Sequence, residues 1–163
     1  MKKIATSFVD SMKHWAANRA TTAPDRPMSI LVVDDEESIL RYLDRVLSEA
    51  GHRTTMAVSG ADAIAAAARG GRFDLLLTDV VMPTMTGAEL ALRLRQDDPD
   101  LKVLYLTGYS DRLFAEKISL CNEEAFLEKP CSVVGLLQAV SLAITGSIGI
   151  KSMPPSDRWR SEA

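Results

Sequence analysis

Residues 73–87 read FDLLLTDVVMPTMTG: an apolar run, an acid at its end, and then a turn-forming stretch with proline and glycine. The run from Phe73 to Thr78 is predicted to be a strand, because it is short, mostly apolar and followed by turn signals. A strand this apolar is typical of the interior of a parallel sheet, where helices cover both faces. Asp79 is therefore expected where a buried strand leaves the sheet.

The same unit, a short apolar strand followed by a helical pattern, recurs on both sides of this stretch. The helical patterns place apolar residues three and four positions apart, as in a helix with one buried face. Strands are expected at 30–33, 53–58, 73–78, 102–106 and 125–128, and helices at about 39–50, 61–69, 90–98, 112–120 and 132–145. This series predicts an α/β fold: a doubly wound, five-stranded parallel sheet in the order 2-1-3-4-5, flavodoxin-like, with helices on both faces.

The strand and helix pattern covers the middle of the chain, and different sequence lies on either side of it. We expect a domain at 28–146, an N-terminal extension at 1–27 and a flexible tail at 147–163. The extension has apolar residues at helical spacing between Ile4 and Trp15, followed by a linker rich in threonine and proline. It is expected to form an amphipathic helix that packs on a partner or on its own domain.

Composition limits the classes of function. The chain of 163 residues is about one domain long, and its net charge of −3 gives no reason to expect direct nucleic-acid binding. The uncharged stretch from Cys131 to Ile150 is about as long as a membrane span, but serines, glycines and a glutamine dilute its hydrophobicity. No apolar signal segment follows the N-terminus. We therefore expect a cytoplasmic protein without membrane contact.

Polar residues follow four of the five expected strands. Asp34 and Asp35 follow the first, Asp79 the third, Thr107 the fourth and Lys129 the fifth. In an open parallel sheet, ligands bind beyond the carboxyl ends of the strands, at the point where the strand order reverses. Three carboxylates, a hydroxyl and an ammonium are therefore expected to meet in one crevice.

This set of groups is suited to phosphoryl transfer. Three close carboxylates repel one another, and a hard divalent cation with oxygen ligands relieves that repulsion, so Mg²⁺ is the expected cofactor. A carboxylate is also a nucleophile toward phosphorus and can form an aspartyl phosphate. Such a reaction needs charge neutralisation and alignment, which Mg²⁺, Lys129 and the Thr107 hydroxyl would provide.

Each residue taken alone also has an ordinary structural explanation. Asp35 could cap the following helix, and Asp34 with Glu37 resembles a capping box. Asp79 could be a turn former, and Lys129 a surface lysine. The occurrence of all of them at four different strand ends favours the chemical interpretation.

Four segments carry a resemblance to a known family: LVVDDE at 31–36, DLLLTDVVMPTMTG at 74–87, LYLTG at 104–108 and FLEKP at 126–130. In these motifs and their spacing, the chain resembles the receiver domains of two-component response regulators over about residues 28–146. The resemblance implies a phosphoacceptor that catalyses its own phosphorylation and dephosphorylation. The donor would be a histidine kinase or a histidine phosphotransfer protein.

The resemblance also implies a role for each matching residue. Asp79 would accept the phosphoryl group, and Asp34, Asp35, Asp79 and the backbone carbonyl of Val81 would bind Mg²⁺, Asp34 mainly through a water. Lys129 would pair with the phosphoryl group.

Two further residues are implied to form the switch. Thr107 would move onto a phosphoryl oxygen while Phe126 turns inward. The peptide bond between Lys129 and Pro130 is expected to be cis.

Other functions remain open at this point. A degenerate receiver would act as a phosphorylation-independent protein-binding module. A phosphatase of the haloacid dehalogenase type would need a second aspartate where Val81 stands, and a nucleotide or flavin binder would need a loop without the acids at 34–37. Signalling is expected to pass to an unknown downstream protein. The uncharged last helix, 133–144, could form a homodimer or pack against an apolar partner because its outer face is expected to be unusually apolar.

Overall fold

The computed structural model describes residues 26–108 and 124–145. Its elements are β1 (Ser29–Val33), α2 (Glu37–Glu49), β2 (Arg53–Ala57), α3 (Gly60–Gly70), β3 (Leu75–Asp79), α4 (Gly87–Asp97), β4 (Lys102–Thr107), β5 (Glu124–Glu128) and α6 (Val133–Thr145). The helices predicted in the N-terminal extension and at 112–120, and the tail at 147–163, lie outside the described residues.

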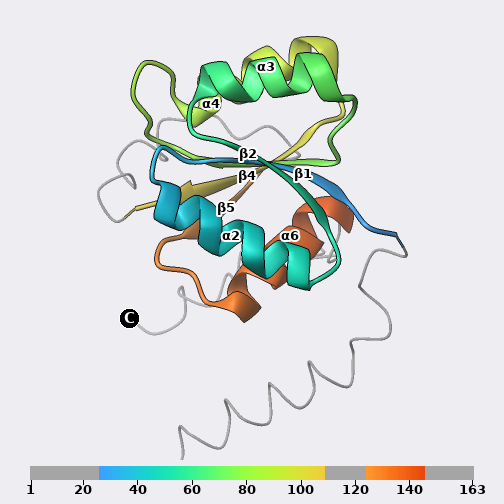
Figure 1. Ribbon diagram of the computed structural model, residues 1–163, viewed down its shortest axis with the longest axis vertical. Coiled ribbons are helices and arrows are strands. Elements are labelled where there is room, and N and C mark those ends of the chain that lie inside the picture. The colour runs from blue at the N-terminus through green and yellow to red at the C-terminus, as the bar shows by residue number, and fades with distance from the viewer. Residues whose placement is uncertain (1–25, 109–123, 146–163) are drawn as a thin grey trace, which may run out of the picture.

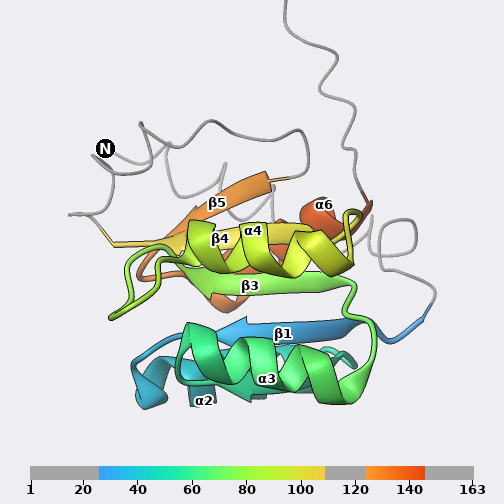
Figure 2. The same ribbon diagram turned by 90° about the horizontal axis from the view of Figure 1, so that it is seen from above.

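The five strands form one sheet in the order β2-β1-β3-β4-β5, and every neighbouring pair is parallel. Helices α3 and α4 cover one face, and α2 and α6 cover the other, as Figures 1 and 2 show. This is the predicted doubly wound, flavodoxin-like arrangement. Neighbours β1 and β3 lie where the strand order reverses, so their carboxyl ends mark the place where such a sheet binds ligands.

Each face of the sheet has its own apolar core, because successive residues of a strand point to opposite faces. Leu76 packs with the residues under α3 and α4, whereas Leu75 and Leu77 pack with those under α2 and α6. All five residues of β3 are buried. Asp79 is therefore the last residue of a central strand that is packed on both faces.

The bounds of several strands and helices differ from the sequence-based prediction. Strand β3 begins at Leu75 and not at Phe73, and the Asp74 side chain accepts the Ser29 backbone N–H at 2.8 Å. On α6, Leu136 and Val140 face the core. Val133 and Leu142 lie exposed, so the outer face of this helix carries apolar side chains, as expected, together with the exposed Gln138. None of the described helices is both long enough and apolar enough to cross a bilayer.

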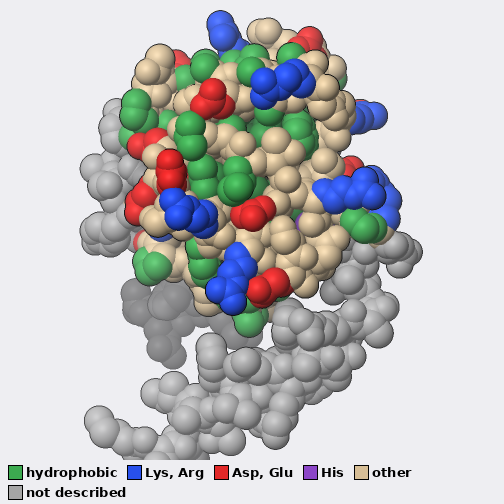
Figure 3. Space-filling view, in the orientation of Figure 1, with side chains coloured by type: hydrophobic (Ala, Val, Ile, Leu, Met, Phe, Trp, Pro, Cys, Tyr) green, Lys and Arg blue, Asp and Glu red, His purple; other side chains and the backbone are tan. Residues whose placement is uncertain are grey.

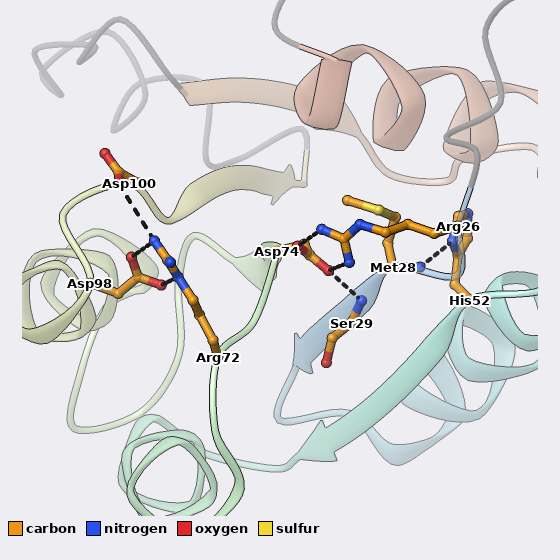
Figure 4. A network of polar contacts seen from close by, with 8 residues as sticks. All are labelled: Arg26, Met28, Ser29, His52, Arg72, Asp74, Asp98 and Asp100. Atoms are coloured by element: carbon orange, nitrogen blue, oxygen red, sulfur yellow. Dashed lines mark hydrogen bonds and ion pairs between the residues drawn. The ribbon is translucent and has the colours of Figure 1, made fainter.

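At the amino ends of the strands, Asp74 fastens β3 to the chain entering β1 (Figure 4). Its carboxylate accepts the Ser29 N–H and pairs with the Arg26 guanidinium, at 2.8 Å in each case. Burial alone would raise the pKa of Asp74, but these hydrogen bonds and the charge of Arg26 outweigh burial and lower it. The network lies at the opposite edge of the sheet from Asp79.

Replacing Asp74 with asparagine should lower the free energy of unfolding by about 1 kcal/mol at pH 7, because the amide lacks the charge that strengthens these bonds. Because the pKa of Asp74 is lower in the folded state, its carboxylate stabilises the fold at pH values above the unfolded pKa of about 3.9. This stabilisation is lost as the pH falls through the folded pKa. Urea denaturation at several pH values should show a constant difference from pH 7 to 5 that shrinks at lower pH. A difference that does not change with pH would contradict this account.

Candidate functional site

Four strand ends bring the predicted site residues to one edge of the sheet. Asp79 is the last residue of β3, and Asp34 follows β1 directly. The register pairs Val33 with Thr78, so Asp34 and Asp79 leave the sheet as neighbours. Thr107 ends β4 and is 5% exposed. The geometry therefore brings together residues that are far apart in the sequence.

Lys129 joins the two buried acids. Its Nζ lies 2.7 Å from Asp34 Oδ2 and 3.3 Å from Asp79 Oδ2. The acids are 1% and 8% exposed. Burial alone would lower the pKa of the Lys129 ammonium, but the hydrogen bond to Asp34 and the charges of both acids raise it. The site therefore holds a positive charge against two carboxylates that are almost fully removed from water.

Asp35 completes an acidic cluster. Asp34, Asp35 and Asp79 each offer a carboxylate oxygen, and these oxygens lie within 4.8 Å of one another. Asp35 is exposed while the other two are buried, so the cluster is open to solvent on one side. An all-oxygen donor set with an open side fits a hard divalent cation such as Mg²⁺, which retains waters.

The capping alternative for the acid pair is wrong. Helix α2 has Glu36 as its N-cap, and no side chain caps it. Asp34 Oδ1 instead accepts the Glu36 backbone N–H at 2.9 Å, while its other oxygen faces Lys129. These two contacts hold the Asp34 carboxylate between the Glu36 N–H and the Lys129 ammonium.

The remaining predicted residues surround this cluster. Val81 is 44% exposed in the loop after β3, and Phe126 lies partly buried on β5. The Lys129–Pro130 peptide bond is cis, as predicted. The register pairs Phe126 with Tyr105 and not with Thr107, which faces Glu128. Tyr105 was not singled out from the sequence, because only the strand pairing places its ring beside Phe126.

Gly87, which the sequence indicated only as a turn residue, allows a close approach at the site. A Cβ atom there would lie 2.1 Å from the Asp79 backbone oxygen. The Gly87 N–H donates to the Val80 carbonyl at 2.9 Å, so α4 begins directly against the strand end that carries Asp79. The sequence feature that could have indicated this contact is the loop with proline and glycine that follows Asp79.

Gly87→Ala should lower the free energy of unfolding by about 2 kcal/mol, because the added methyl overlaps backbone that cannot move aside. The matched control is Gly70→Ala at the last residue of α3, where a Cβ meets nothing within 4 Å. The control should be neutral or slightly stabilising, since alanine favours helix. Thermal or urea unfolding of both variants measures the difference. Equal effects at the two positions would show that the close approach to Asp79 is not the cause.

Comparisons with known proteins find one family over most of the described residues. The model of the response regulator receiver domain matches residues 30–141. The response regulator receiver protein CpdR of Brucella abortus is 42% identical over 111 residues, 68% of this chain and 92% of that protein. A crystal structure of a response regulator receiver protein from Sinorhizobium medicae has a TM-score of 0.65 and 29% identity, and the match covers 73% of this chain and 95% of the other.

Some relatives are much longer than this chain. The sensor kinase CckA of Brucella abortus is 34% identical over 113 residues, which are 69% of this chain but 12% of the kinase. The DNA-binding transcriptional regulator NtrC of Azospirillum brasilense is 30% identical over 128 residues, 26% of its length. In these proteins the similarity covers one segment of a longer chain.

Proposed function

The chain belongs to the response regulator receiver domain family, and on that basis we propose that it is a phosphoacceptor switch of a two-component phosphorelay. Asp79 would receive a phosphoryl group from a histidine of a kinase or a phosphotransfer protein. The observation that carries the proposal is the placement of Lys129 Nζ at 2.7 and 3.3 Å from the buried carboxylates of Asp34 and Asp79. This placement sets an ammonium beside two buried carboxylates at the strand ends, where a phosphoryl group on Asp79 would need positive charge.

The reaction follows from these groups. A carboxylate oxygen of Asp79 attacks phosphorus, a P–O bond forms, and the P–N bond to the donor histidine breaks with its electron pair returning to the imidazole. Lys129 neutralises charge on the phosphoryl oxygens, and the Thr107 hydroxyl donates a hydrogen bond to one of them. In dephosphorylation, which the chain would also catalyse, water attacks phosphorus and the bond to Asp79 breaks.

The acidic cluster is proposed to hold Mg²⁺. Asp34, Asp35, Asp79 and the backbone carbonyl of Val81 would hold the ion, with Asp34 acting mainly through a water. Bound Mg²⁺ supplies positive charge that offsets the phosphoryl oxygens. The oxygens of the three acids, within 4.8 Å of one another and open to solvent through Asp35, support this assignment.

The proposed switch couples Thr107 to Phe126. In the phosphorylated state the Thr107 hydroxyl turns to the phosphoryl group, and the Phe126 ring occupies the inward position. Two conformations whose balance depends on contacts made only with the phosphoryl group are sufficient for signalling.

The output is proposed to be a protein contact in the cytoplasm. The downstream protein would recognise the surface that the switch alters, and a homodimer through α6, with Val133 and Leu142 exposed, is one form of that contact. On the face shown in Figure 3, Lys and Arg side chains alternate with Asp and Glu among the coloured residues. That mixed charge favours a protein partner over direct contact with nucleic acid.

Phosphotransfer tests the histidine source. The native chain and Asp79→Asn are mixed with a phosphotransfer protein carrying phosphohistidine, and the phosphoryl group is followed by intact mass. Loss from the donor with a gain on the native chain only is expected. A chain that takes a phosphoryl group from a small donor but from no histidine-phosphorylated protein of its own cell would refute the histidine source and leave the acceptor chemistry intact.

A further inference from the structure

The ring of Phe126 rests on a second aromatic ring. Tyr105 on β4 and Phe126 on β5 are partners in the strand register, so both side chains lie on the same face of the sheet. Their centroids are 5.0 Å apart and their planes are inclined by 26°, a stacked arrangement. Tyr105 is 1% exposed, and Phe126 packs from its partly buried position against the same core.

Tyr105 is anchored at its far end by a buried ion pair. Its hydroxyl donates to Glu124 Oε1 at 3.2 Å, and the same oxygen lies 2.6 Å from Arg95 Nη1. The Arg95 side chain is 16% exposed and the Glu124 side chain is 6% exposed. Arg95 also donates through Nε to the Leu101 carbonyl at 2.9 Å. The hydroxyl is thus held by Glu124 of β5, which is itself fixed by Arg95 of α4, and this leaves the Tyr105 ring little freedom to move.

We propose that Tyr105 is a positioning residue for the switch: its anchored ring favours the inward, stacked position of Phe126. This inference rests on the proposed function, in which the inward position accompanies phosphorylation. Stacking on a fixed ring stabilises one position of Phe126 over others, and an aromatic pair changes such a balance by about two- to tenfold. Because phosphorylation favours the inward position of Phe126, a residue that stabilises this position also stabilises the phosphorylated form. Tyr105 therefore raises the affinity of the site for a phosphoryl group.

Beryllofluoride, a non-covalent mimic of a phosphoryl group, measures that affinity at equilibrium. Its binding in the presence of Mg²⁺ is compared for the native chain, Tyr105→Leu, Phe126→Leu and the double variant. Tyr105→Leu should weaken binding by about two- to tenfold, but should have no further effect once Phe126 is leucine. Tyr105→Phe, which keeps the ring, should lose less than Tyr105→Leu. Asp74→Asn, at the opposite edge of the sheet, should bind as the native chain does.

Equal weakening by Tyr105→Leu in both backgrounds would overturn the proposal, because the effect would not pass through Phe126. If the native chain itself fails to bind beryllofluoride with Mg²⁺, the proposed function fails, and a second measurement then decides the positioning role. In chains labelled with 4-fluorophenylalanine and free of ligand, Tyr105→Leu should shift or broaden the ¹⁹F resonance of Phe126. An unchanged resonance would contradict the positioning role.

Discussion

Lys129→Met should lower the free energy of unfolding of the metal-free protein by about 3 kcal/mol at neutral pH, because removing one partner of a buried ion pair leaves an uncompensated charge. The Asp34 carboxylate is 1% exposed, and Lys129 Nζ lies 2.7 Å from it. Without the ammonium, this carboxylate and that of Asp79 face each other with no positive charge between them. Urea denaturation in a chelator measures the loss.

The matched control is Lys102→Met at the first residue of β4, at the opposite edge of the sheet. It makes the same chemical change away from the acidic cluster and should alter stability by less than about 1 kcal/mol. Mg²⁺ should stabilise Lys129→Met more than the native chain, since the ion supplies the missing charge. Equal losses in the two variants, or a Lys129→Met chain that does not respond to Mg²⁺, would show that Lys129 does not balance the acids.

Asp35→Ala should weaken Mg²⁺ binding by about a hundredfold while leaving the fold intact. Asp35 is the exposed member of the acidic cluster, so its removal empties no core position. It does remove one of the few charged ligands available to a cation that binds through oxygen. The rise in unfolding temperature with Mg²⁺ concentration gives the affinity.

Asp100→Ala is the control for this change, because Asp100 is an exposed acid remote from the cluster that pairs only loosely with Arg72, at 3.5 Å (Figure 4). It should respond to Mg²⁺ as the native chain does. A response of Asp35→Ala that matches the native chain would remove Asp35 from the proposed ligands and place the ion elsewhere.

The fold was predictable because its signals are local. Apolar runs such as Leu75–Leu77 and the helical spacing that follows them are read directly from neighbouring residues, and parallel connectivity then leaves few strand orders. The site was predictable for the same reason: Asp34, Asp79 and Lys129 follow strands, and parallel strands bring their carboxyl ends to one edge. Their individual roles stay predictions.

Contacts between distant residues were not predictable. Nothing local to Glu124 indicates that it pairs with Arg95 or receives the Tyr105 hydroxyl, because these contacts exist only once β4, β5 and α4 are packed. The contact of Gly87 with the Asp79 backbone is of the same kind. The capping box suggested by Asp34 and Glu37 was wrong for a related reason. The spacing of the two residues matches the motif, but the Asp34 carboxylate contacts Lys129 and no side chain caps α2.

The most direct test of the central claim is the intact mass of the purified chain after incubation with acetyl phosphate and Mg²⁺. The account predicts a gain of one phosphoryl group that is abolished by a chelator and by Asp79→Asn, with borohydride trapping mapping it to Asp79. A native chain that gains nothing, or an Asp79→Asn variant that gains as much as the native chain, would contradict the assignment of Asp79 as the phosphoacceptor.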